Sequence, residues 1–298
     1  MKPHGITRAE MDVLGLPRRR AVNRTMELLA TATAVLGVAI LVVIVWSVAR
    51  RGAGALNLDL LTKTPMPFSF TNAPTGIANA FVGTLVLVGL ATAMALPVGI
   101  LVAVYLNEFA RPSIRGVVSL ALDVLNGIPA IVIGIFVFGL VVVGHGQSAF
   151  AGSFALACLM LPLVARSTQE ILALVPDSSR EASLALGVPR WRTTLSVVLP
   201  QTIGGIVTGT TLAVARVAGE TAPLLFTSSL VGQQIQGNPR HALWSVPVAI
   251  FEYSDSPDPK DHAQAWAAAL VLLAFILAVS LGARALAGRS RRRMGLSR

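Results

Sequence analysis

The sequence has little of what soluble and secreted proteins are usually built from. Only 13% of its 298 residues are charged, against about 25% in soluble domains. Its one cysteine, Cys158, lies in an apolar stretch, so an intrachain disulfide is excluded and we interpret it as a core residue. The four histidines are scattered without the spacing of metal ligands, and we expect no metal site.

The sequence also lacks a nucleotide-binding loop. No glycine is followed directly by a lysine, so the GxxxxGK[ST] loop that cradles phosphate groups is absent. We find no grouping of nucleophile, base and orienting residue that would suggest catalysis. We therefore expect a protein that is not an enzyme and binds no cofactor itself. Any step driven by ATP would depend on a partner.

What the sequence does contain is long apolar runs. Hydrophobic residues make up 54% of the chain, and the mean hydropathy is +0.72. A helix that crosses a bilayer needs about 20 apolar residues. Runs near this length occupy residues 28–48, 79–106, 117–143, 149–165, 200–226 and 263–287. We predict an all-α integral membrane protein with six transmembrane helices, the short fourth run continuing as helix beyond its end.

The chain shows no low-complexity linker, which favours one membrane domain. We place the six-span transmembrane domain at 28–287, between basic tails at 1–27 and 288–298. The 21 residues of the first run exceed the 7–15 apolar residues typical of a cleaved signal peptide, so we expect it to remain. The long loops 49–78 and 227–262 are either surfaces for an extracytoplasmic partner or plain solvated loops. The second loop is acidic near its end, with Glu252, Asp255, Asp258 and Asp261.

The distribution of basic residues predicts the orientation. With the N-terminus inside, 18 of the 24 Lys and Arg residues fall in cytoplasmic segments and 5 in outer loops. Cytoplasmic loops of membrane proteins carry such an excess, so we expect both termini in the cytoplasm. The same distribution explains the net charge of +10 without nucleic acid as a partner.

The fifth run is diluted by threonine and glycine. Gly205 and Gly209 form a GxxxG pattern, which allows two helices to approach closely. The run also holds Arg216 and Glu220, four residues apart and therefore on one face if the helix is continuous. A charge at membrane depth costs about 2.5–3.5 kcal/mol by insertion scales. The pair is either an intrahelical ion pair that eases insertion, or is kept for a substrate that passes it.

The cytoplasmic loop 166–199 has a helical pattern of its own. Ser178 or Ser179 is placed to cap a short helix from Glu181 to Leu186. Gly187 is placed to end that helix in the left-handed conformation, and Pro189 prevents its continuation. A second helical stretch is predicted to begin near Trp191 and to enter the fifth run. Such a helix is either a docking element or an ordinary interfacial helix.

This loop resembles the EAA loop of ABC-transporter permeases. The match consists of Glu181-Ala182-Ser183, Gly187 after three residues, Val197 after nine more, and Leu199-Pro200. Ser183 replaces an alanine of the motif, and Val197 replaces an isoleucine. In that family the loop seats in a groove of the ATP-binding subunit. The resemblance implies that Glu181, Ala182 and Gly187 couple this chain to an ATPase.

A finer resemblance points to the PstA-type permeases of phosphate-specific transport systems. It is carried by LNGIPAIVIGIF at 125–136, LPLVARSTQEILALVPDSSREASLALG at 161–187, GETAPLLFT at 219–227 and AWAAALVLLAFIL at 265–277. It implies the type I ABC importer fold in the bacterial inner membrane. It also implies a PstC-like permease, a PstB-like ATPase dimer that uses ATP and Mg²⁺, and a PstS-like phosphate-binding protein.

If phosphate is the substrate, the charged residues within the fifth run would contact it. A phosphate ion in a low-dielectric path needs a compensating cation, and an arginine fork binds its oxygens with two donors. Arg216 lies in the interior of a predicted span, whereas Arg284 stands near the end of the last one, so we expect Arg216, with Glu220, to face the path. Thr221 would add a hydroxyl there or face another helix. The alternative substrates are other oxyanions, molybdate or sulfate, and a further alternative is an ATP-independent transporter or channel.

Arg166, at the end of the fourth run, is a second candidate for the path, near its inner exit. It would otherwise serve as a positive anchor at the membrane surface. Asp123 is either a buried partner for one of these two arginines or a residue of the cytoplasmic interface.

Overall fold

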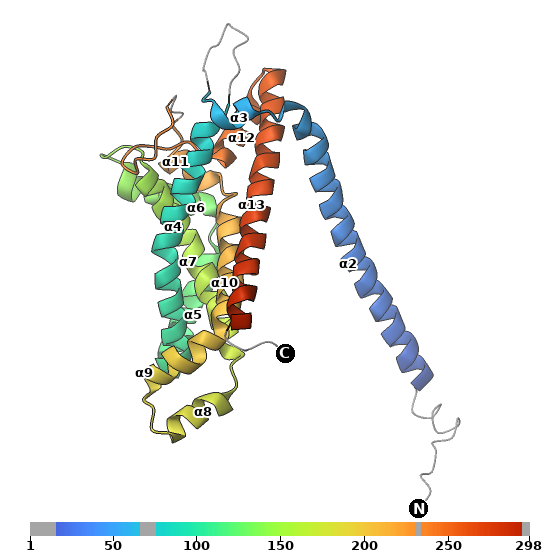
Figure 1. The fold of residues 1–298 in the computed structure, drawn as a ribbon, viewed down its shortest axis with the longest axis vertical. Coiled ribbons are helices and arrows are strands. Elements are labelled where there is room, and N and C mark those ends of the chain that lie inside the picture. Colours follow the sequence, from blue (N-terminus) through green and yellow to red (C-terminus); the bar gives the residue numbers. More distant parts are fainter. Residues whose placement is uncertain (1–15, 66–75, 231–233, 294–298) are drawn as a thin grey trace, which may run out of the picture. The chain divides into compact units, whose positions relative to one another are not determined.

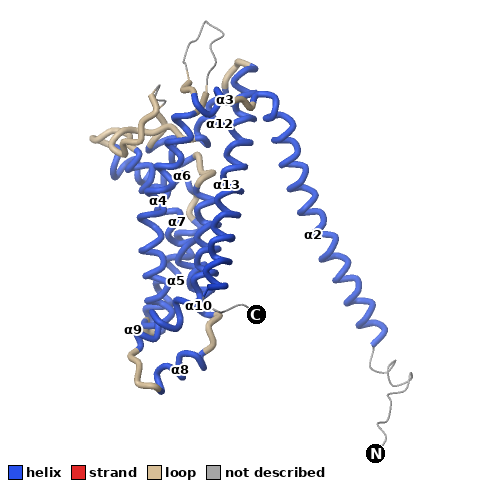
Figure 2. Tube along the Cα trace, in the orientation of Figure 1, coloured by secondary structure: helices blue, strands red, loops and turns tan. Residues whose placement is uncertain are grey.

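The computed structural model describes residues 16–65, 76–230 and 234–293, and within them the side chains of 18–65, 76–230 and 234–285. The described residues form helices connected by loops, and no strand occurs among them (Figure 2). The chain divides into two compact units, residues 1–51 and 52–298. The division into domains predicted from the sequence stays a prediction.

The described part of the first unit is one long helix, α2, which runs over Leu16–Gly52 and ends at the boundary with the second unit. It contains the first apolar run, and its large apolar side chains, among them Leu29, Leu41 and Trp46, are exposed within the unit. Four arginines, Arg18, Arg19, Arg20 and Arg24, stand at its beginning. A helix that is apolar on all sides and has a basic end is typical of a span surrounded by lipid or other helices.

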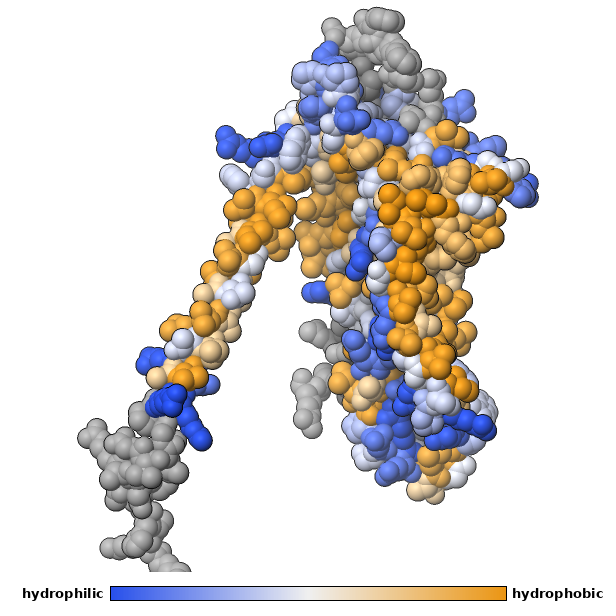
Figure 3. Space-filling view, turned by 180° about the vertical axis from the view of Figure 1, so that it is seen from behind, coloured by the Kyte–Doolittle hydropathy of each residue, from blue (hydrophilic) through white to orange (hydrophobic). Residues whose placement is uncertain are grey.

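The second unit is a bundle whose long helices run side by side (Figure 1). They are α4 (Ala78–Val104), α7 (Ala149–Ala173), α10 (Leu199–Val217) and α13 (Pro259–Arg293). The main core centres on the contact between α4 and α7, includes residues of α10, α12 and α13, and is built largely from small residues and leucine. Seen from behind, an apolar band covers much of the bundle, and polar residues cluster at its two ends (Figure 3).

Small residues set the spacing between α7 and α10. A Cβ atom at Gly205 would lie 2.6 Å from Cγ2 of Ile171, and one at Gly209 would lie 2.5 Å from the Ser167 hydroxyl oxygen. Both distances are too short for a real Cβ contact, so a larger residue at either position would force the Ile171 or Ser167 side chain to move. The close contact predicted from the GxxxG pattern is therefore confirmed, with α7 as the partner helix.

The third apolar run is not one straight span. It forms α5 (Pro112–Gly127) and then α6 (Ala130–Val137), which continues into the π-helical turn η3 (Phe138–Val142). The axes of the two parts differ by 97°. Among the described residues, five helices are long and apolar enough to span a membrane, and this bent pair makes six if counted as one span. The chain is thus an all-α multi-pass membrane protein, as predicted.

The fifth run also differs from the prediction. Its helix begins earlier, at α9 (Arg190–Thr193), and passes through the π-helical turn η4 (Thr194–Val198) into α10. It then stops at Val217, and a separate short helix, α11, follows over Ala222–Thr227. The prediction of a continuous helix over 200–226 was therefore wrong. The helical stretch expected near Trp191 is confirmed.

Short helices occupy the two ends of the bundle. At one end lie η1 (Ala53–Ala55), α3 (Leu58–Thr62) and α12 (Val246–Asp255). At the other end α8 (Asp177–Ala185) projects beyond the long helices, and the π-helical turn η2 (Tyr105–Phe109) completes α4 (Figure 1). The fourth run does continue as helix, to Ala173. Arg166 therefore lies within α7, and the loop proper begins at residue 174, later than the predicted 166.

Candidate functional site

The breaks in the two interrupted helices meet beside α7. A small cavity lies between them, and its wall combines residues of both breaks with two leucines of α7: Leu125, Asn126, Ile128, Ala130, Leu159, Leu163, Arg216, Val217 and Glu220. Three of these side chains are polar or charged, and the others are apolar. Unwound backbone at membrane depth is tolerated where it is buried in protein or lines a cavity. The two breaks thus form the candidate substrate site.

The first break is caused by a proline. Pro129 has no backbone N–H to continue the hydrogen bonds of α5, and its ring disfavours a helical conformation at the preceding residue. Ile128 accordingly has an extended backbone, with φ −70° and ψ 129°. Pro129 itself is extended and precedes the first residue of α6. The chain turns at Gly127-Ile128-Pro129, whereas Pro97 and Pro162 lie inside α4 and α7 without ending those helices.

The second break sets the position of the two predicted path residues. After Val217 the chain makes a turn in which the N–H of Gly219 donates to the Arg216 carbonyl at 3.1 Å, and that of Glu220 to the Val217 carbonyl. Pro223 then occupies the first turn of α11, where a missing N–H costs little. Glu220 is therefore outside the helix that holds Arg216, which corrects the expectation that both stand on one helical face.

The ion pair between Arg216 and Glu220 is loose. The closest atoms, Nε of Arg216 and Oε1 of Glu220, are 4.0 Å apart. The Arg216 side chain is 65% exposed in this chain, whereas that of Glu220 is 24% exposed. A guanidinium held this loosely keeps donors for a further acceptor. Thr221 directly precedes α11 without capping it and is not among the residues lining the cavity.

Arg166 has a different environment. Its guanidinium pairs with the Asp123 carboxylate of α5, and Nη2 donates to the Ser119 carbonyl at 2.6 Å. Nη1 donates to the Gln169 side chain at 3.3 Å. Arg166 is not among the residues lining the cavity beside Arg216. The structure thus brings together Arg166 and Asp123, and it brings together Arg216 and Glu220, as two separate pairs.

Two of the acidic residues of the second long loop, Glu252 and Asp261, accept hydrogen bonds from other residues of the same loop. Trp244 Nε1 donates to the Glu252 carboxylate at 2.9 Å, and the Ser256 hydroxyl donates to Asp261 at 2.6 Å. Burial raises the pKa of Glu252, and the hydrogen bond from Trp244 opposes that shift. No group of three or more His, Cys, Asp or Glu side chains in the described part of the chain is placed to hold a metal ion.

The short helix predicted in the loop 166–199 is present as α8, with different limits. It begins at Asp177 rather than at Glu181, and Pro176 precedes it, so no serine side chain caps it. The capping role predicted for Ser178 or Ser179 was wrong, because both residues lie inside the first turn. Glu181 and Ala182 are exposed in the middle of α8. Leu186 follows the helix and is 85% exposed, which adds an apolar group to this surface.

Gly187 ends α8 as predicted. Its φ is +78°, and its N–H donates to the Leu184 carbonyl at 2.9 Å. The next N–H, of Val188, donates to the Ser183 carbonyl. This is the arrangement in which a left-handed glycine satisfies the last carbonyls of a helix. A Cβ atom at Gly187 would meet nothing within 4 Å, so the requirement for glycine comes from the backbone alone.

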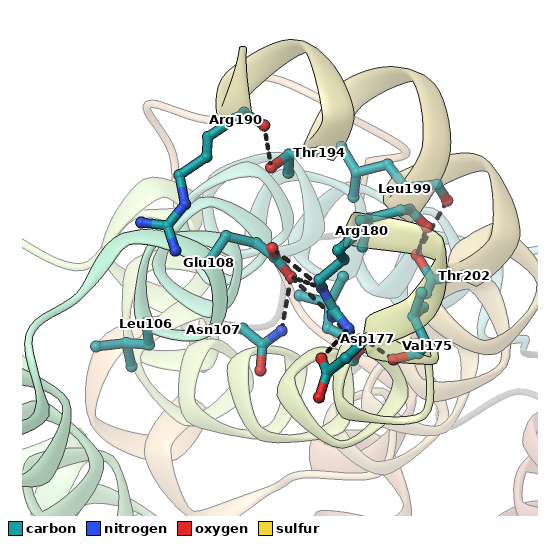
Figure 4. Close-up of polar contacts among 12 residues, drawn as sticks. Leu106, Asn107, Glu108, Val175, Asp177, Arg180, Arg190, Thr194, Leu199 and Thr202 are labelled. Carbon is teal, nitrogen blue, oxygen red and sulfur yellow. Dashed lines mark hydrogen bonds and ion pairs between the residues drawn. The ribbon is translucent and has the colours of Figure 1, made fainter. Parts of the chain in front are cut away.

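Two contacts of α8 were not predicted from the sequence. Ser183, which departs from the EAA pattern, is buried and exchanges a 2.9 Å hydrogen bond with the Thr193 hydroxyl of α9. Arg180 forms an ion pair with Glu108 at the end of α4, 72 residues earlier (Figure 4). No local periodicity links residues so far apart. The only signal was the departure from the motif at Ser183.

Comparisons with known proteins agree with this fold. A family model described as "Binding-protein-dependent transport system inner membrane component" matches residues 95–292. Among solved structures, the chain resembles the MetNI methionine ABC transporter in an inward-facing conformation, with a TM-score of 0.57, 18% identity, and coverage of 72% of this chain and 94% of that one. It also resembles a bacterial ABC transporter for alginate import, with a TM-score of 0.55, 16% identity, and coverage of 86% and 95%. Fold and family model together define an ABC importer permease.

Curated relatives narrow the family. The chain is 40% identical over 278 residues to the phosphate transport system permease protein PstA of Xylella fastidiosa, covering 92% of this chain and 95% of the relative. It is 40% identical to PstA of Yersinia pestis, with 89% and 90% coverage, and 38% identical to PstA 1 of Mycobacterium tuberculosis, with 92% and 91% coverage. The chain belongs to the PstA family of phosphate transport system permeases.

Proposed function

We propose that this chain is a transmembrane permease subunit of an ATP-driven importer of inorganic phosphate. The observation that carries the proposal is the placement of Arg216, whose loosely paired guanidinium borders a cavity between two broken helices. The names of relatives that share about 40% of their residues with this chain support phosphate as the substrate.

Arg216 and Glu220 would contact the passing ion. The planar guanidinium can donate two hydrogen bonds to phosphate oxygens and stays charged at any physiological pH. Glu220 as a carboxylate can only accept hydrogen bonds, so it would accept one from the oxygen of phosphate that still carries a proton near neutral pH. Sulfate has no such proton and would leave Glu220 unpaired. Thr221 and Arg166 remain lesser candidates, the first beside the break and the second near the inner exit.

Coupling to ATP would pass through α8. Glu181, Ala182 and Gly187 would seat in a groove of an ATPase subunit, and the exposure of Glu181 and Ala182 supports this role. The chain has no Gly-Lys pair, so ATP and Mg²⁺ would be bound by the partner alone. We infer that the partners are a PstC-like permease, a PstB-like ATPase dimer and a PstS-like phosphate-binding protein. The complex would lie in the bacterial inner membrane, with both termini of this chain in the cytoplasm.

Uptake of labelled phosphate into vesicles that contain the complete complex tests the proposal. We expect uptake that requires both ATP and the binding protein, and that excess sulfate or molybdate does not inhibit. Preferential uptake of one of these oxyanions would assign the chain to that substrate instead. Uptake that proceeds equally without ATP would indicate a channel or an ATP-independent transporter.

A further inference from the structure

Arg180 is the residue of α8 that turns toward the bundle. It directly precedes the exposed Glu181, yet only 18% of its side chain is exposed. Its guanidinium donates to three groups besides Glu108. Nη1 donates to the Val175 carbonyl at 2.6 Å and to Asp177 at 3.1 Å, and Nη2 donates to the Leu172 carbonyl at 3.0 Å. Figure 4 shows the guanidinium between the end of α4 and the connection from α7 to α8.

Glu108 is equally confined. Its side chain is 11% exposed, and its carboxylate accepts from Nε of Arg180 at 3.3 Å and from Nη2 at 3.0 Å. It also accepts from the Asn107 amide at 2.8 Å. Glu108 lies in the π-helical turn that ends α4, and π-turns in helices often occur at functional positions. Two nearly buried, opposite charges with several hydrogen bonds between them hold a fixed geometry.

The Arg180 side chain therefore connects three segments: the start of α8, the end of α7 and the end of α4. Arg180 connects α8 to a carbonyl in the last turn of α7 and to the end of α4, two helices that both contribute to the main core. At its other end α8 is held to α9 by the bond between Ser183 and Thr193, and α9 continues into α10. The surface of α8 that carries Glu181 and Ala182 stays exposed between these two attachments.

We propose that the ion pair of Arg180 and Glu108 is a mechanical connection, here called the tie, that transmits a movement of α8 to α4 and α7. This proposal rests on the proposed function, in which an ATPase moves α8. Arg180 is then a positioning residue that does not contact the ATPase, since its donors are directed into the chain. A loosened tie would let α8 follow the ATPase while the core helices lag behind. ATP would be hydrolysed with less phosphate carried per turnover.

The test compares variants of the assembled complex in vesicles. Glu108→Gln and Arg180→Lys change the pair while keeping side-chain size and some hydrogen bonds, and Arg180→Ala removes it. Arg190→Ala, an exposed arginine of the same cytoplasmic segment, is the matched control for lost positive charge. The measurements are the phosphate imported per ATP hydrolysed and the amount of ATPase that co-purifies. We expect Arg180→Ala to lower that ratio at least 5-fold, on the order of 1 kcal/mol of coupling, with the ATPase retained and Arg190→Ala unchanged.

A double variant separates a shared tie from two independent effects. If the two side chains act as one tie, Glu108→Gln combined with Arg180→Ala should be no worse than Arg180→Ala alone. An unchanged ratio of phosphate to ATP in Arg180→Ala would overturn the proposal. So would loss of the ATPase from all three single variants, since the pair would then serve only to maintain the fold. Absence of phosphate import by the unmodified complex would refute the proposed function instead, and is seen before any variant is made.

Discussion

Gly134 of α6 and Pro223 of α11 lie in direct backbone contact. A Cβ atom at Gly134 would be 2.6 Å from Cα of Pro223 and 3.3 Å from its carbonyl oxygen. Each residue belongs to the short helix that follows one of the two breaks, so this contact joins the two interrupted spans immediately beside the candidate substrate site. We expect the width of that site to depend on how closely α6 and α11 approach, because Ala130 at the start of α6 and Glu220 just before α11 both line it.

Gly134→Ala should therefore impair transport without removing any polar group. The added methyl group has no space against Pro223, and overpacking of this kind costs about 1–3 kcal/mol. We expect uptake to fall several-fold, and thermal unfolding of the detergent-solubilised complex to begin at a lower temperature. Gly139→Ala, in the same segment but with nothing within 4 Å of its Cβ position, is the matched control. Equal behaviour of the two variants would argue against the contact as a determinant of the site.

The geometry of Arg216 predicts that its shape matters as well as its charge. Arg216→Lys keeps the charge but loses the planar fork, and we expect uptake to fall at least 10-fold. Glu220→Gln should admit sulfate as a competitor, because the amide can donate a hydrogen bond to an unprotonated oxyanion. Competition assays with both ions measure this. The double variant Arg216→Gln, Glu220→Gln is the decisive case. If it assembles and takes up phosphate normally, the pair has only a structural role.

Gly187 tests the coupling surface through backbone strain alone. Gly187→Val requires a branched residue at φ +78°, whereas Gly187→Asn should be tolerated because asparagine adopts this region more readily. We expect the valine variant to lose uptake, or the bound ATPase, while it still inserts into the membrane. Gly144→Val imposes the same strain at φ +84° in the segment between η3 and α7 and should leave ATPase binding intact. The comparison is made by co-purification and by uptake.

The buried bond between Ser183 and Thr193 predicts a stability effect that depends on which partners are removed. Ser183→Ala restores the residue of the EAA pattern but leaves the Thr193 hydroxyl unpaired, at a cost of about 1–3 kcal/mol. Ser183→Ala combined with Thr193→Val removes both polar groups and should recover most of the loss. Thermal unfolding of the purified complex measures the difference. If the double variant is less stable than Ser183→Ala, the bond is not what holds α8 to α9.

The orientation can be tested with single cysteines in a Cys158→Ser background. Ser178 of α8 and Ser254 of α12 are exposed, and they belong to segments that the distribution of basic residues assigns to opposite sides of the membrane. An impermeant thiol reagent added to right-side-out vesicles should label only the cysteine at position 254. Labelling of both positions before the vesicles are opened would contradict the predicted topology.

The sequence by itself determined the class of structure. Low charge and six apolar runs are sufficient for a multi-span helical protein, because the bilayer leaves few other ways to satisfy backbone hydrogen bonds. Local chemistry also predicted Gly187, since a left-handed helix end depends on adjacent residues. The close approach of α10 to another helix was also predictable, because the GxxxG pattern lies within four consecutive residue steps. The sequence did not show that the partner helix is α7.

Only the tertiary structure decided how the interrupted spans and the charged pairs are arranged. Hydropathy averages over a run, so it did not show that α5 and α10 end at Gly127 and Val217 within apolar stretches, or that Glu220 lies outside the helix of Arg216. The partners Arg180 with Glu108, and Arg166 with Asp123, are 72 and 43 residues apart. Such pairs form because helices distant in sequence are packed side by side, and no local pattern records which helices become neighbours.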